Sequence, residues 1–128
     1  MAALRIDPSS ATPIWSQIED GVRRLVASGA LKPGAAVPSV RDLAKDLRVK
    51  PATVAKAYQR LTDTGLLTVR RGDGTYVADA PPAMSKAERA RILREAAGRF
   101  ADFASTLGVP REEAEEALRT AWKKGANS

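Results

Sequence analysis

The feature that most limits how this chain can fold is the order of helix and turn signals between residues 39 and 77. Ser39, with Asp42 three residues further on, forms a capping-box-like helix start. The stretch RVKPATVAKAYQRL at 48–61 places proline in a first turn and repeats apolar residues at helical spacing, and Gly65 follows as a left-handed helix end. Two short helices joined by a tight connection predict a helix-turn-helix unit.

A β-hairpin is expected immediately after this unit. Leu66–Arg70 and Thr75–Val77 are β-branched or apolar runs on either side of RRGDG. Asp-Gly favours a tight hairpin turn because these residues tolerate positive φ. A helix-turn-helix followed at once by an arginine-tipped hairpin predicts a winged helix.

The N-terminal part of the chain is predicted to supply one further helix. Residues 1–11 are expected to be extended and locally unstructured. Thr12 as the N-cap and Pro13 as the first helical residue then open a helix that Gly29 ends. Its buried stripe consists of Ile14, Ile18, Val22, Leu25 and Val26, with Trp15 beside them.

Two more helices are expected after a Pro-rich linker at 78–84. Ser85 and Glu88 form a capping box for the first, and the second begins near Pro110. We therefore predict a mainly α fold with a small β-hairpin wing. Its domains are a winged helix-turn-helix DNA-binding domain at 1–77, the linker, and a two-helix dimerisation tail at 85–128.

The tail carries apolar residues in alternating steps of three and four, which is a heptad-like seam. About forty residues cannot bury a sufficient core alone, so this seam suggests pairing with a second copy of the chain. Folding back onto the winged domain and lying on a membrane surface are the alternatives. The predicted dimerisation residues are Leu93, Ala97, Phe100, Ala104, Leu107, Leu118 and Trp122.

The charge distribution indicates a polyanionic partner. The net charge is +6, and residues 39–78 hold eight Lys and Arg against four Asp and Glu. A local basic surplus of this kind is typical of nucleic-acid-binding surfaces.

The composition argues against an enzyme. The chain has no His and no Cys, which removes the commonest general base and the commonest metal ligands. No catalytic triad or phosphate-cradling loop is present, so we expect no activity and no cofactor. No apolar run approaches the ~20 residues of a membrane span, and the start MAALRIDPSS lacks the order of a secretion signal. The absence of Cys fits a cytoplasmic location.

The predicted DNA contacts come from three elements. The second helix of a helix-turn-helix enters the major groove, so its first turn meets base edges. An arginine opening the preceding helix can reach a phosphate or a guanine, and one at the wing tip can enter a narrow minor groove. The candidates are Ser39, Arg41, Lys50, Ala52, Thr53, Lys56, Arg70, Arg71, Gly72 and Thr75.

Residues 29–77 resemble the N-terminal winged helix of the GntR family of bacterial transcription regulators. The motifs that carry this resemblance are PSVRDLA, TV followed by AY, GLL and RGDGTYV, all in order and at family spacing. The preceding IDPSSATPIWSQIEDGVRRLVASG and the short two-helix tail are similar to the YtrA subfamily, which extends the resemblance over nearly the whole chain.

The resemblance implies a homodimeric DNA-binding regulator, commonly a repressor of nearby transporter operons. It also implies DNA contact at Arg41, at residues 50–53, and at Arg71 and Gly72. Larger relatives have a ligand-binding domain of over a hundred residues. This tail is far too small for one, which makes a small-molecule effector doubtful.

The sequence departs from the family in the recognition turn. Relatives usually carry Ser or Asn where this chain has Lys50 and Ala52, so we expect a poorer N-cap and less direct hydrogen bonding to bases. More of the specificity is then expected from Arg41, Thr53 and DNA shape.

The function predicted from the sequence is a dimeric transcription repressor at a palindromic operator. Its 50–64 helix would lie in the major groove and its 70–75 wing at the minor groove. A non-specific architectural DNA-binding protein is the main alternative. A protein-interaction module whose basic face meets an acidic partner is a third possibility.

Overall fold

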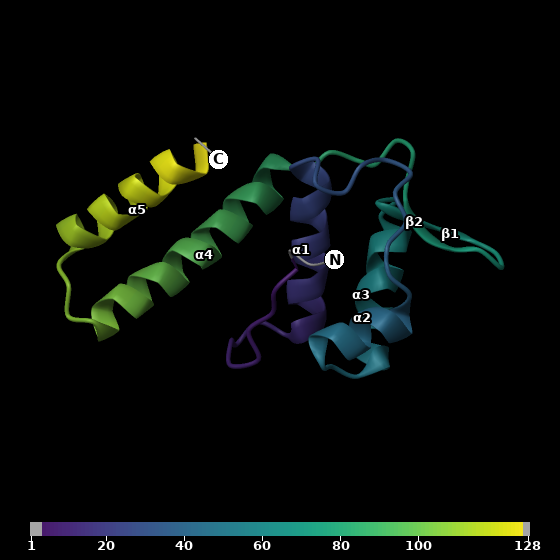
Figure 1. Cartoon of the computed structure of the whole chain (residues 1–128), viewed down its shortest axis with the longest axis horizontal. Coiled ribbons are helices and arrows are strands. Elements are labelled where there is room, and N and C mark those ends of the chain that lie inside the picture. The colour runs from purple at the N-terminus through teal and green to yellow at the C-terminus, as the bar shows by residue number, and fades with distance from the viewer. Residues whose placement is uncertain (1–3, 127–128) are drawn as a thin grey trace. The chain divides into compact units, whose positions relative to one another are not determined.

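The computed structural model describes residues 4–126, and over this range the chain forms five helices and one two-stranded antiparallel sheet (Figure 1). The elements are α1 (Ile14–Ala27), α2 (Val40–Leu47), α3 (Pro51–Asp63), β1 (Leu67–Arg70), β2 (Gly74–Val77), α4 (Lys86–Thr106) and α5 (Arg111–Ala126). One compact unit ends at Met84 and a second begins at Ser85. None of the helices in the described part of the chain is long and apolar enough to cross a membrane.

The first unit is built around α3, which packs against α1, α2 and β1. This order of helices and hairpin confirms the predicted winged helix-turn-helix. The side chains that meet at its centre are apolar and lie on the inward faces of these elements. The largest fully buried ones are Ile18, Val22, Leu43, Val54, Leu61, Leu67 and Val77.

Local signals place the ends of α2 and α3 as the sequence predicts. The Ser39 hydroxyl accepts a hydrogen bond of 3.1 Å from the Asp42 amide and caps α2. Pro51 is the first residue of α3, and Gly65, at φ +83°, follows its last turn. The N-cap of α3 is Lys50, which forms no side-chain cap hydrogen bond. This agrees with the poorer cap expected from the sequence.

Backbone pairing holds the hairpin in place along both edges of β2. On one edge, β1 pairs with β2 in a register that places Val69 opposite Thr75. On the other edge, the Val37 amide donates to the Thr75 carbonyl oxygen at 3.0 Å, and Ala36 forms a bridge with Tyr76. The segment before α2 therefore fixes the base of the wing beside the start of α2.

The segment before α1 differs from its prediction. Within residues 4–11, Leu4 is buried against α1, and the Gln17 side chain accepts a hydrogen bond from the Asp7 amide at 2.7 Å. A Cβ at Gly21 would lie 2.1 Å from Leu4 Cδ1, so glycine makes room for this contact. Residues 4–11 form no helix or strand, as expected, but the sequence did not predict the contacts with α1 that anchor this segment.

The start of α1 also differs by one position. Pro13, not Thr12, is the N-cap, and no side chain caps the helix. The Thr12 carbonyl oxygen instead accepts a hydrogen bond from Gln17 Nε2 at 2.9 Å.

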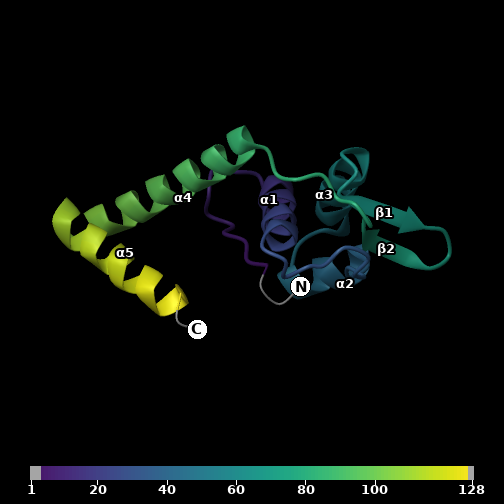
Figure 2. The same cartoon turned by 90° about the horizontal axis from the view of Figure 1, so that it is seen from above.

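The second unit consists of α4 and α5, which are joined by a turn and diverge from it (Figures 1 and 2). The Ser85 hydroxyl accepts a hydrogen bond of 3.0 Å from the Glu88 amide and caps α4, as predicted. Gly108, at φ +69°, lies in the turn. Among the side chains described in this unit, only Ala104 is buried.

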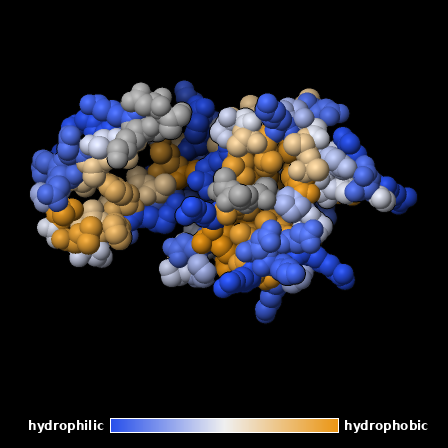
Figure 3. Space-filling model, viewed as in Figure 1, coloured by the Kyte–Doolittle hydropathy of each residue, from blue (hydrophilic) through white to orange (hydrophobic). Residues whose placement is uncertain are grey.

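Most of the predicted seam is exposed to solvent. Apolar side chains gather on the visible face of the α4–α5 unit (Figure 3). The large ones that are exposed are Leu93, Phe100, Phe103, Leu107, Leu118 and Trp122. Ala97 is exposed as well, whereas Ala104 offers little surface to a partner because it is already buried.

Candidate nucleic-acid interface

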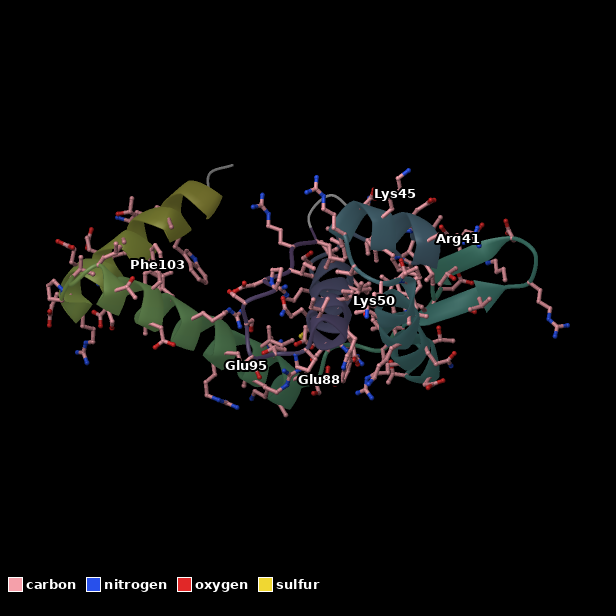
Figure 4. The ribbon with its side chains drawn as sticks, turned by 90° about the horizontal axis from the view of Figure 1, so that it is seen from below. Arg41, Lys45, Lys50, Glu88, Glu95 and Phe103 are labelled. Carbon is pink, nitrogen blue, oxygen red and sulfur yellow. The ribbon has the colours of Figure 1, made fainter. Side chains whose placement is uncertain are left out.

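The first element of the candidate interface is the amino end of α2. Arg41 lies in its first turn with an exposed side chain and forms no ion pair within residues 4–126. The same is true of Arg71 in the wing, which is described below. Figure 4 shows Arg41 on the side of α2 that faces the hairpin, with Lys45 further along the same helix. The Ser39 hydroxyl is engaged as the helix cap. A guanidinium held in this way can donate two hydrogen bonds to one phosphate or one guanine.

The second element is the first turn of α3. The Lys50 and Ala52 side chains are exposed, and that of Thr53 is partly exposed. No side chain caps the helix. Pro51 has no N–H, and the Thr53 amide donates to the Lys50 carbonyl oxygen at 3.0 Å, so the Ala52 amide and the positive end of the helix dipole are what this turn offers to an anion. An anionic phosphate suits such an end, with Lys50 adding a full positive charge.

The third element is the wing, where the two predicted arginines differ. The Arg70 guanidinium lies over the Tyr76 ring, with its Cζ 4.0 Å from the ring centroid. A hydrogen bond between the Tyr76 side chain and Asp73 raises the pKa of Tyr76. Arg71 and Gly72, by contrast, are exposed at the turn. Arg70 therefore has a partner within the wing, and Arg71 is the arginine that projects from it.

Thr75 contributes to the wing through its backbone. Its side chain is partly buried, and its carbonyl oxygen accepts the hydrogen bond from Val37. The same pairing brings the start of α2 beside β2, so the structure places Arg41 and the wing next to each other.

Tyr58 links α3 to the start of α2. Its hydroxyl donates a hydrogen bond of 2.7 Å to the Pro38 carbonyl oxygen, one residue before the cap of α2. Burial of this side chain raises the pKa of Tyr58 well above its ordinary value. This buried side chain thus also connects two elements of the candidate interface.

Lys56 lies in a different environment from the other predicted contacts. Its Nζ is 4.4 Å from the centroid of the Trp15 ring, and the Arg60 guanidinium lies 4.8 Å from the same centroid. Both cations on α3 are therefore directed toward α1. This cation–π pairing gives Lys56 a partner inside the protein.

A buried carboxylate that sequence reasoning missed lies on the same side. Glu19 is 6% exposed, and its two oxygens accept hydrogen bonds from Arg60 Nε at 2.7 Å and from Arg23 Nη2 at 3.0 Å. Glu19 lies three positions before Val22 of the apolar stripe, and Arg23 lies four positions after Glu19. The i,i+4 pairing was visible in the sequence, but its burial depends on α3.

Arg48, between α2 and α3, was also missed. It is the only residue other than glycine with positive φ in the described chain, at φ 57° and ψ 47°. Its amide bonds to the Ala44 and Lys45 carbonyl oxygens, and the Val49 amide donates to Ala44 O at 2.9 Å. For an L-residue with a side chain, this left-handed conformation costs ~1 kcal/mol or more.

Comparisons with known proteins identify a family and several relatives that this chain resembles. Residues 15–77 match the family described as bacterial regulatory proteins, gntR family. The chain is 34% identical to the HTH-type transcriptional repressor YtrA of Bacillus subtilis, over 91% of this chain and 89% of that protein.

Two solved structures are similar as well. One is YtrA from Sulfolobus acidocaldarius, a GntR-family transcription factor, with a TM-score of 0.58 and 38% identity over 74% of this chain and 96% of that one. The other is the DNA-binding domain of AraR in complex with operator ORX1. Its TM-score is 0.52, with 28% identity over 59% of this chain and 93% of that one.

Proposed function

Because this chain belongs to the GntR family of bacterial regulatory proteins, we propose that it is a sequence-specific DNA-binding transcription regulator. In this proposal it acts as a dimeric repressor at a palindromic operator. Helix α3 lies in the major groove, and the wing at residues 70–75 lies at the minor groove.

The observation that carries the proposal is the exposed set of cations on adjoining elements. Arg41 opens α2, Lys50 precedes the uncapped first turn of α3, and Arg71 projects from the wing. Backbone pairing between Val37 and Thr75 holds the first and third of these elements together. Two helix ends and a hairpin presented in this way match how winged helix-turn-helix proteins dock on a duplex.

The DNA contacts that we propose follow from the exposure of each side chain. Arg41 and Thr53 read base edges, and Lys50 contacts a phosphate together with the Ala52 amide of α3. Arg71, with Gly72 beside it, approaches the minor groove. The contribution of Lys56 is expected to be smaller, because it already has the Trp15 ring as a partner.

The dimer in this proposal forms through the α4–α5 unit. Its large apolar side chains are exposed in the single chain, and a symmetric pairing of two copies would cover them. A two-fold axis would then hold two α3 helices about one DNA turn apart, which is what a palindromic operator requires.

Selection of bound duplexes from a random pool tests this function directly. We expect recovery of a palindrome whose two half-sites are separated by about one helical turn. The recovered site should then bind ~10³-fold or more tightly than a random duplex at the same salt concentration. Equal binding of both duplexes would instead support the non-specific architectural protein, and absence of binding at low salt would support a protein-interaction module.

Arg41→Ala tests the docking of the first helix. We expect a loss of about 1–3 kcal/mol in operator binding with an unchanged fold. Arg24→Ala is the matched control, because Arg24 is also an exposed helical arginine of the first unit but lies on α1. Equal effects of the two substitutions would contradict the proposed orientation.

A further inference from the structure

The connection between α2 and α3 places an arginine where the backbone favours glycine. Elsewhere in the described chain, positive φ occurs only at glycines, including Gly29, Gly65 and Gly108 at helix ends. At the end of α2 the corresponding residue is Arg48, at φ 57°. Glycine adopts this conformation without the steric strain that a Cβ introduces.

The backbone at this position has a clear structural role, but that role does not require arginine. The turn closes α2 through hydrogen bonds to Ala44 and Lys45, and it directs Val49 toward the core. Glycine would form the same hydrogen bonds with less strain. What arginine adds over glycine at this position is its side chain.

That side chain is directed to solvent. Arg48 is exposed and forms no ion pair within residues 4–126, although the exposed Asp46 is only two positions away. The neighbouring exposed cations are Lys45, on the last turn of α2, and Lys50, at the start of α3. Arg48 thus places a third positive charge on this connection, at a backbone position where a side chain introduces local strain.

We propose that Arg48 binds a DNA phosphate beside the recognition helix and that its side chain is retained there for this contact. The inference rests on the proposed DNA-binding function and adds a residue to it. A guanidinium is suited to phosphate because it can donate two parallel hydrogen bonds. A phosphate contact carries no sequence information, so Arg48 strengthens binding to operator and to random DNA alike.

Arg48→Gly tests the two expected effects of arginine at this position, which are backbone strain in the folded chain and a contact with a DNA phosphate. The thermal unfolding midpoint is expected to rise by a few degrees, because strain is relieved. Binding to a random-sequence duplex is expected to weaken severalfold. Its logarithmic salt dependence between about 50 and 200 mM should fall by ~0.9, the value for one lost phosphate contact. Arg48→Lys should keep most of the salt dependence, because the charge remains.

The controls make failure of this inference distinguishable from failure of the proposed function. Arg24→Ala removes an equal charge from α1 and should leave the affinity and salt dependence close to those of the unaltered chain. If Arg41→Ala weakens binding while Arg48→Gly leaves both affinity and salt dependence unchanged, Arg48 is not a contact and this inference fails alone. If neither substitution affects binding, the proposed docking fails as well. A lower unfolding midpoint in Arg48→Gly would overturn the strain argument.

Discussion

The two units of this molecule differ in how far their apolar side chains are buried. In the first unit, α1, α2 and β1 surround α3, and Leu61 of α3 is fully buried. In the second unit, Leu107 and Trp122 remain 63% and 74% exposed. Both units show apolar residues at helical spacing, so periodicity alone does not determine burial. What differs is the number of elements available to cover each apolar face.

This difference suggests a division of roles. A unit that covers its own core can present a rigid surface, because its side chains are fixed by packing on several sides. A two-helix unit with uncovered apolar faces is completed only by something outside it. This division is what the proposed function requires: a DNA-binding surface on the winged unit and, in the proposed dimer, an association surface on the α4–α5 unit.

The largest expected effect comes from the core of the first unit. Leu61→Ala should lower the free energy of unfolding by about 2–5 kcal/mol, because it leaves a cavity at a site enclosed on all sides. Leu107→Ala is the matched substitution in the second unit and should leave the winged unit's stability nearly unchanged. Hydrogen exchange of the α3 amides measures both. Similar losses of protection would contradict the division between the units.

The next largest effect tests whether a second copy of the chain covers the apolar side chains of the second unit. Phe103→Asp should raise the dimer dissociation constant by ~100-fold or more, because in a two-fold dimer the loss of ~1.5 kcal/mol or more counts once in each copy. Sedimentation equilibrium of the full chain measures it. Val69→Asp is the matched control, since Val69 is 61% exposed and Phe103 62% exposed. A chain that is monomeric without any substitution would refute the proposed association surface.

The elements that the sequence predicts correctly are those specified by neighbouring residues. Ser39 caps α2, Pro51 starts α3, and Gly65 ends it. The hairpin also lies where it was predicted, but Asp73-Gly74 is not its turn: Gly74 pairs with Arg70, so the turn consists of Arg71, Gly72 and Asp73, and the positive φ falls at Gly72. Each signal acts through the backbone within a few positions, so its meaning does not depend on the rest of the fold. The winged helix follows from their order.

The features that the sequence did not predict depend on contacts between distant residues. Leu4 becomes ordered through Gly21, Glu19 is buried only because Arg60 reaches it from α3, and Lys56 is drawn to Trp15. The distinction between Arg70 and Arg71 likewise depends on which of them stacks on Tyr76 across the hairpin. In the candidate site, residue types and spacing identify the charged groups, but only the fold shows which of them are already engaged.

The smallest expected effect concerns a buried polar group of the first unit, the hydroxyl of Tyr58. Tyr58 is 5% exposed, and burial raises its pKa above the ordinary value of 10.0. Below pH 10 the hydroxyl is protonated in both the folded and the unfolded chain, so its contribution to stability is constant. Above pH 10 the unfolded chain releases the proton while the folded chain retains it. Stability therefore falls as pH rises, by up to ~1.4 kcal/mol per pH unit.

Tyr58→Phe should remove this pH-dependent term. At neutral pH the variant is expected to be less stable by about 1 kcal/mol, because the hydrogen bond to the Pro38 carbonyl oxygen is lost. Between about pH 8 and pH 11 its stability should decline less steeply than that of the unaltered chain. Urea unfolding of both proteins at the two pH values measures the difference, because the titrating groups that the two proteins share cancel in the comparison. An equally steep decline in both proteins would mean that Tyr58 is open to solvent, and that the first unit is less closed around α3 than its burial indicates.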